Sequence, residues 1–138
     1  MAGSENIQVV YGKTLELLKV AQAALVTSGT ATLETALIGT PQVVCYKTAP
    51  VSYLVARMLV RIKYISLVNL ILERGCITEL IQNRCSAPNI INSLNLVLND
   101  PDFRSRITVG YRELDAKLGD REASATAAAV VCRLAMES

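Results

Sequence analysis

The chain has 138 residues, which is the length of a single domain. Half of its residues are hydrophobic, few are aromatic, and it contains no His and no Trp. This composition predicts an aliphatic core, argues against a disordered chain, and removes the commonest general base and metal ligand. The net charge of +2, with no run of Lys or Arg, argues against a nucleic-acid-binding surface.

The first third of the chain predicts strands that alternate with helices. Apolar or β-branched runs predict strands at Ile7–Val10, Ala24–Thr27 and Gln42–Lys47. Helical spacing predicts a helix at Thr14–Ala23, and a second helix follows the residues SGT and ends at Gly39.

The remaining chain is mostly helical in pattern. Pro50 predicts the start of a helix over Val51–Ile62, and KYISL predicts a strand at Lys63–Leu67. The segment Asn69–Gln82 has no single period. Further helices are predicted at residues 89–98, 104–118 and 123–136.

Short buried strands that alternate with helices predict an α/β fold with a Rossmann-like parallel sheet of about four strands. The helical tail is expected to pack on this sheet or to cross to another domain. Because a doubly wound domain usually has more strands, residues 1–138 are expected to form one incomplete domain, the later part of a larger unit.

The sequence predicts neither a cysteine-based disulfide or metal site nor a signal peptide or membrane span. The four cysteines lack CxxC spacing and are expected to be free thiols of a reducing compartment: Cys45, Cys76, Cys85 and Cys132. The N-terminus has no signal-peptide pattern, and the most apolar window, Val51–Leu72, is interrupted by charges. Two of these charges, Arg57 and Arg61, share a helix face that is either solvated or in contact with an anionic surface.

The residues that follow the second predicted strand suit an anion. In a parallel sheet, ligands bind where strands end and helices begin, and the first turn of a helix offers free backbone N–H groups. Gly29 lets a phosphate approach the backbone closely. The hydroxyls of Ser28, Thr30 and Thr32 either cap the helix or donate to phosphate oxygens.

A carboxylate one turn further on extends this pattern. Glu34 follows Thr30 by four residues, so that both lie on one helix face. One helical turn away from the phosphate position, the Glu34 carboxylate can accept hydrogen bonds from the vicinal hydroxyls of a ribose. A site for a phosphate next to a site for a ribose is a site for a nucleotide. The residues alone are equally consistent with a nucleotide site and with an ordinary helix cap in which Glu34 compensates the helix dipole.

Other polar residues are weaker candidates. Asn69, Glu79 and Gln82 lie in an otherwise apolar stretch and either line a cleft or serve as caps and surface residues. Tyr46 and Lys47 end a predicted strand and are expected at the same rim as Ser28. No nucleophile–base pair and no paired carboxylates are apparent, so no catalytic residue is predicted in this chain.

The segment SGTATLETALIGTPQVVCYK resembles the donor-binding segment of the lipid-A-disaccharide synthase family. The likeness continues through KYISLVNLI, TELIQ and DPDFRSR, and covers about Ile7 to Leu134. The same pattern is similar, more distantly, to the UDP-sugar site of the bacterial murein N-acetylglucosaminyltransferase.

The resemblance implies the C-terminal half of a GT-B fold and a hexosyltransferase of lipid A biosynthesis. This enzyme transfers 2,3-diacylglucosamine from its UDP derivative to 2,3-diacylglucosamine 1-phosphate, and requires no metal or cofactor. The resemblance places the UDP donor on eight residues, with the hydroxyl and glycine positions on the diphosphate and Glu34 on the ribose. These residues are Ser28, Gly29, Thr30, Thr32, Glu34, Asn69, Glu79 and Gln82.

The chain departs from the family at Val68 and Thr78, where the family has prolines. The family's N-terminal acceptor domain and candidate general base are expected to lie outside this chain, so this portion alone is expected to be inactive. The alternative is a stand-alone, non-catalytic UDP-sugar-binding subunit that needs a partner chain; a third hypothesis is an interaction domain whose SGT is only a cap.

The expected partners are the UDP-sugar donor and the lipid acceptor, with no nucleic acid. The expected location is the cytoplasm, at the cytoplasmic face of the inner membrane. An incomplete sheet leaves an exposed edge, which predicts a possible homodimer.

Overall fold

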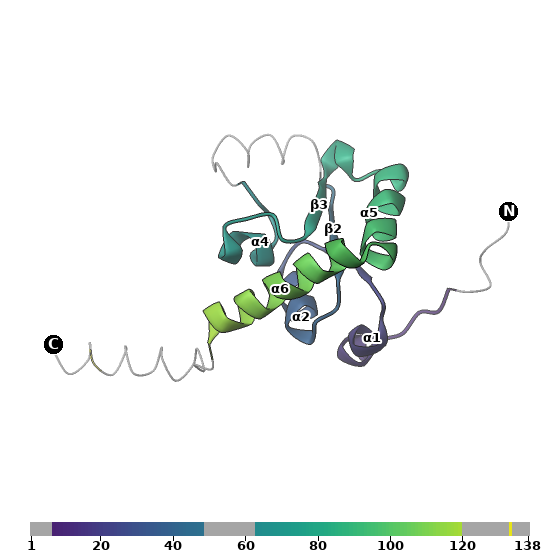
Figure 1. The fold of residues 1–138 in the computed structure, drawn as a ribbon. Coiled ribbons are helices and arrows are strands. Elements are labelled where there is room, and N and C mark those ends of the chain that lie inside the picture. Colours follow the sequence, from purple (N-terminus) through teal and green to yellow (C-terminus); the bar gives the residue numbers. More distant parts are fainter. Residues whose placement is uncertain (1–6, 49–62, 120–132, 134–138) are drawn as a thin grey trace, which may run out of the picture.

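The computed structural model describes residues 7–48, 63–119 and residue 133 (Figure 1). Its helices and strands alternate along the first part of the chain, and two longer helices close it. In chain order they are α1 Thr14–Val20, β1 Ala24–Thr27, α2 Thr30–Ile38, β2 Gln42–Tyr46, α4 Leu67–Leu72, β3 Thr78–Ile81, the 3-10 turn η1 Gln82–Arg84, α5 Ala87–Asn99 and α6 Pro101–Leu118.

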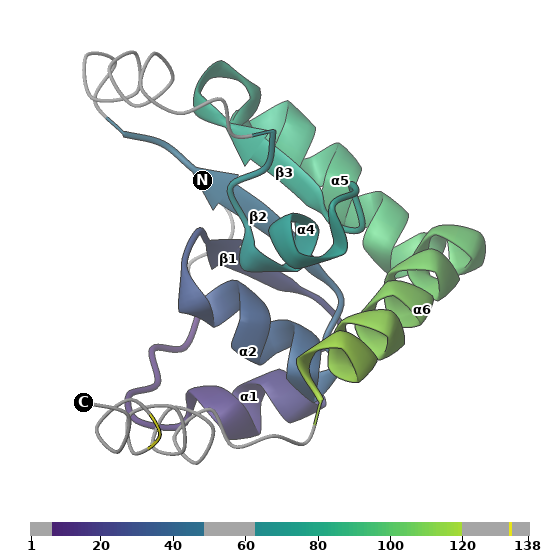
Figure 2. The same cartoon turned by 90° about the vertical axis from the view of Figure 1, so that its left-hand side faces the viewer.

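The three strands of the described residues form one parallel sheet in the order β1-β2-β3. Val26 pairs with Val44, and Cys45 pairs with Leu80. Helices α2 and α4 contact each other, and Figures 1 and 2 show α4 and α5 on opposite faces of the sheet. Because β2 is covered on both faces, its consecutive residues Val43 and Val44 are both completely buried.

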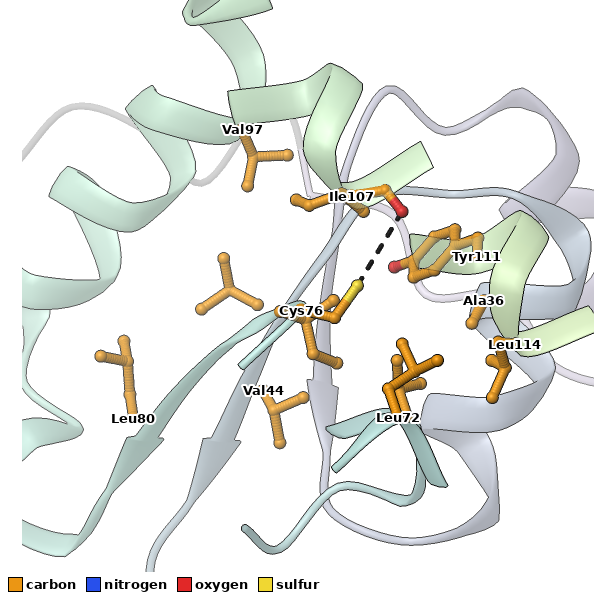
Figure 3. Close-up of a cluster of buried hydrophobic side chains, with 12 residues drawn as sticks. Ala36, Val44, Leu72, Cys76, Leu80, Val97, Ile107, Tyr111 and Leu114 are labelled. Atoms are coloured by element: carbon orange, nitrogen blue, oxygen red, sulfur yellow. Dashed lines mark hydrogen bonds between the residues drawn. The ribbon is translucent and has the colours of Figure 1, made fainter. Parts of the chain in front are cut away.

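The core joins the sheet to α4 and α6 (Figure 3). Helix α6 lies near the edge where the strands begin, since Gln42, the first residue of β2, donates from Nε2 to the Tyr111 hydroxyl over 3.1 Å. A side chain at Gly110 would place its Cβ 2.2 Å from the Cys76 Sγ, so this close contact of α6 requires glycine. The sulfur lies 3.9 Å from the carbonyl oxygen of Ile107.

Most predicted elements are confirmed, with shifts of a few residues at their ends. The strand Ala24–Thr27 has the predicted bounds, and the strand predicted at Gln42–Lys47 is β2. Helix α2 ends at Gly39, whose φ of 91° is left-handed and whose N–H donates to the Ala36 carbonyl. The helices predicted at 51–62 and 123–136 lie outside the described residues, apart from residue 133, which is helical.

Two predicted strands are wrong. Residues Ile7–Val10 are irregular and exposed, because β-branched residues form a strand only where a neighbouring strand pairs with them. The segment Lys63–Leu67 is also not a strand: Ser66 caps α4 by accepting from the Asn69 N–H, which starts a helix at Leu67. The third strand is instead Thr78–Ile81, inside the segment without a period.

Candidate functional site

Two of the predicted site residues, Ser28 and Gln82, lie at the edge of the sheet where the parallel strands end. Ser28 follows β1, Thr48 lies two residues after β2, and Gln82 follows β3. Figure 2 shows the three strands running in the same direction, so these residues share one edge of the sheet. This is the edge at which open α/β sheets bind ligands.

The SGT turn, Ser28–Thr30, carries β1 into α2. Gly29 has φ 138° and ψ −164°, a conformation that is essentially restricted to glycine. No side chain caps the nine-residue helix α2, and a Cβ built on Gly29 has no atom within 4 Å. The turn therefore has open space at Gly29 beside the start of α2, where the Thr32 N–H already donates to the Gly29 carbonyl and the N–H groups before it are the ones that suit an anion.

The three hydroxyls near this turn have different environments. The Ser28 Oγ donates to the Ile65 carbonyl over 2.9 Å. Thr32 is completely buried, and its Oγ1 donates to the Gly29 carbonyl over 2.8 Å. Thr30 is exposed. Thr30 is therefore the hydroxyl that faces solvent, while those of Ser28 and Thr32 hold the turn in place from two sides.

Glu34 lies one turn along α2 and is exposed. It forms no ion pair with another described residue. Its carboxylate is therefore free to accept hydrogen bonds from a ligand that reaches past the SGT turn, as the predicted ribose contact needs.

Asn69, in contrast, has no free hydrogen-bonding group. Its side chain is buried, and its Oδ1 accepts from the N–H groups of Cys76 and Ile77 over 2.8 and 3.0 Å. Its Nδ2 donates to the Ile77 carbonyl and to Glu79 Oε1, both over 2.9 Å. Asn69 therefore fixes the loop between α4 and β3.

Glu79 accepts four hydrogen bonds within the protein. Its Oε2 accepts from the Ile65 N–H over 3.0 Å. Its Oε1 accepts from the N–H and Oγ of Ser66 over 3.0 and 2.7 Å, and from Asn69. We call Glu79, Ser66 and Asn69 the Glu79 cluster.

Gln82 differs from the Glu79 cluster because it keeps a free donor. Its Oε1 accepts from the Thr48 N–H over 3.2 Å, which links the ends of β2 and β3. Its Nε2 is buried with no partner among the described residues, and its backbone has a left-handed φ of 51°. An unpartnered buried donor is costly, so a ligand acceptor at this point would relieve it.

The structure thus joins the SGT turn to the Glu79 cluster through the Ser28–Ile65 hydrogen bond, and places Gln82 at the end of the strand that carries Glu79. Sequence reasoning missed Ser66 and Thr48. Ser66 could have been found as a serine cap, because it precedes the apolar run of α4 and its side chain accepts from the residue three positions on. Thr48 could not, because it contributes only its backbone.

Two features are not found in the described part of the chain. It contains no group of three or more His, Cys, Asp or Glu side chains arranged to hold a metal ion. Among its helices, none is both long and apolar enough to cross a bilayer.

Comparisons with known proteins identify the family. The model of the family described as lipid-A-disaccharide synthetase matches residues 3–132. A lipid-A-disaccharide synthase of Syntrophus aciditrophicus is 38% identical over 137 residues, which are 99% of this chain and 36% of the relative. Those of Anaeromyxobacter dehalogenans (strain 2CP-1) and Geobacter sulfurreducens are 40% and 31% identical, over 83% and 96% of this chain and 30% and 35% of the relatives.

The chain therefore spans about a third of the length of these relatives. The match runs from before α1 to beyond α6, so it includes the SGT turn, the Glu79 cluster and Gln82. The chain belongs to the lipid-A-disaccharide synthase family.

Proposed function

We propose that this chain forms the UDP-binding portion of a lipid A glycosyltransferase. The whole enzyme transfers 2,3-diacylglucosamine from its UDP derivative to 2,3-diacylglucosamine 1-phosphate, and releases UDP and the lipid A disaccharide 1-phosphate. The observation that carries the proposal is the uncapped start of α2 at Gly29, with the free carboxylate of Glu34 one turn further on. Family membership supports the same reaction.

The diphosphate is bound by the SGT turn. The conformation of Gly29 leaves open space above the backbone, so phosphate oxygens can approach the first N–H groups of α2. Thr30 adds an exposed hydroxyl. Ser28 and the buried Thr32 belong to this site because their hydroxyls fix the carbonyls and backbone that shape the turn.

The ribose is bound by Glu34, and the donor is completed by the neighbouring strand end. A carboxylate accepts strongly from a pair of vicinal hydroxyls, and Glu34 has no competing cation among the described residues. Gln82 offers its unpartnered Nε2 to an acceptor of the donor molecule. Asn69 and Glu79 belong to the site by resemblance, and their contacts tie the loop before α4 to β3.

The acceptor, the general base and the membrane contact are assigned to the two thirds of the enzyme beyond this chain's match. We propose that the whole enzyme acts at the cytoplasmic face of the inner membrane, where its lipid substrates lie. The edge of the sheet at β1 is half-exposed at Leu25, which supports the proposal that two copies of this chain can pair there.

Titration of the chain with UDP, followed by amide NMR, tests the proposed function. We expect saturable shifts at residues 28–34 and 69–82, weaker binding of pyrophosphate, and weaker binding of uridine. No saturable shift at millimolar UDP would refute the proposal. Shifts that saturate elsewhere would refute the assignment of the site.

Two glycines of the chain provide a matched pair of variants. Gly29 and Gly39 both have a positive φ, of 138° and 91°, and a Cβ on either meets no atom within 4 Å. Alanine at either position strains the backbone by about 1–3 kcal/mol. Because only Gly29 lies at the start of α2, Gly29→Ala should weaken UDP binding, whereas Gly39→Ala should lower stability and leave UDP affinity unchanged.

A further inference from the structure

A continuous path of hydrogen bonds leads from β3 to the SGT turn. The Glu79 carboxylate binds the N–H groups of Ile65 and Ser66 and thereby fixes the peptide that joins them. The carbonyl of Ile65 belongs to this peptide, and it accepts the Ser28 hydroxyl over 2.9 Å. The position of Ser28, and of the glycine next to it, therefore depends on a carboxylate that lies on another strand.

The residues of this path have little capacity left for a ligand. An amide side chain has two donor hydrogens and one oxygen with two lone pairs, and Asn69 uses all four. The carboxylate of Glu79 already accepts four hydrogen bonds. Ser28 has one hydroxyl proton and gives it to Ile65, so it cannot also donate it to a phosphate oxygen.

We propose that Glu79 is a positioning residue of the donor site, which acts on the ligand through Ser66, Ile65 and Ser28 and makes no contact with it. The inference rests on the proposed function, because it concerns the same UDP site. Asn69 acts one step further back, by holding Oε1 of Glu79. The groups that touch the diphosphate are then the backbone of the SGT turn and Thr30.

Glu79→Gln is the direct test, because glutamine keeps the shape but replaces one acceptor oxygen with a donor NH2. At least one of the N–H groups of Ile65 and Ser66 then loses its partner. If Glu79 acts through Ser28, the two residues are coupled. We expect Glu79→Gln to weaken UDP binding about tenfold in the natural chain, and less than about twofold when Ser28 is already alanine.

A direct contact between Glu79 and UDP predicts a different result. The losses caused by Glu79→Gln and Ser28→Ala would then multiply in the double variant, and this outcome would overturn the proposal. Ser66→Ala removes the 2.7 Å hydroxyl contact with Glu79 and the side-chain cap of α4, and keeps the charge of Glu79. If Glu79→Gln does not fold, Ser66→Ala combined with Ser28→Ala provides a milder form of the same double-mutant comparison.

A measurement without ligand separates this inference from the proposed function. In the free chain, we expect Glu79→Gln to lower the NMR order parameters of Gly29 and Thr30 and to leave α6 unchanged. Glu113→Gln is the matched control, because it removes the charge that pairs with Arg74, whose Nη2 lies 2.6 Å from Glu113 Oε2, and because Glu113 lies on α6 and not at the SGT turn. Unchanged order parameters at the turn would overturn the coupling even if UDP binds.

The converse result is also decisive. If the natural chain does not bind UDP but Glu79→Gln still loosens Gly29 and Thr30, the proposed function fails and the coupling stands. UDP binding and the order parameters of the free chain therefore show together whether the proposed UDP site or the proposed hydrogen-bond path is wrong.

Discussion

Removal of the Glu34 carboxylate is the sharpest test of the nucleotide assignment. Glu34→Ala leaves α2 intact, because alanine is the best helix former and Glu34 makes no ion pair with another described residue. A hydrogen bond to a charged group contributes about 1.5–3 kcal/mol. Since Glu34 is exposed and water competes for it, we expect the lower end of this range, which is about a tenfold loss of UDP affinity.

The choice of ligands makes this prediction specific to the ribose. Pyrophosphate has no ribose, and its affinity should stay constant or rise slightly, because a negative charge near it has been removed. UDP that lacks the 2′-hydroxyl should bind the natural chain more weakly and should lose less than UDP on Glu34→Ala. Isothermal titration calorimetry of the three ligands gives the comparison, with Glu16→Ala on the exposed face of α1 as the control.

Equal weakening of UDP and pyrophosphate would remove Glu34 from the ribose. It would show instead that the substitution disturbs the SGT turn as a whole. Unchanged affinity for all three ligands would mean that Glu34 only compensates the dipole of α2, which is the alternative that the sequence leaves open.

Three further predictions concern the scaffold. Gly110→Ala should lower the free energy of unfolding by about 1–3 kcal/mol, and Cys76→Ala in the same chain should recover most of this loss, because the clash is with the Cys76 sulfur. Asp100→Ala should cost about 1 kcal/mol, because the Asp100 carboxylate caps α6 by accepting from the Phe103 N–H over 2.9 Å, whereas Asp100→Asn should be nearly neutral in a urea titration. The hydrogen bond and charge of Arg74 lower the pKa of Glu113, so the stability that this pair adds is present above the ordinary glutamate pKa and is lost as the pH falls through the lowered value. Glu113→Gln should remove this part of the acid dependence, and an unchanged profile would contradict it.

The elements that the sequence predicts well are those whose signals are local. The strand Ala24–Thr27 and helix α2 are marked by an apolar run, by the residues SGT and by the glycine stop at Gly39. The third strand, Thr78–Ile81, is missed because it forms by pairing with β2, which is distant in the chain, and the role of Glu79 is missed because its partners lie 13 and 14 positions earlier. The irregular Ile7–Val10 was predicted as a strand because propensity does not reveal whether a neighbouring strand exists.

The same distinction applies to the site. Sequence and resemblance together select Ser28, Asn69 and Glu79, but they cannot separate a residue that touches a ligand from one that holds another residue. That separation depends on whether its hydrogen bonds are already made, which is a property of the folded chain. The structure shows all four hydrogen-bonding positions of Asn69 in use, Glu79 accepting four hydrogen bonds, and Gln82 with a free donor.

A site built mainly from backbone donors depends on where its turn is held. Any residue except proline can supply an N–H group, so the residues that fix the turn decide the geometry of such a site. Here the turn is held from two directions, by Ser28 toward the loop before α4 and by Thr32 toward the carbonyl of Gly29. Substitutions that remove either hydrogen bond should weaken the binding of UDP and of pyrophosphate alike, because both ligands bind the same backbone. Only the loss of Glu34 should distinguish them, and this contrast separates the residues that shape the site from the residue that recognises the nucleoside.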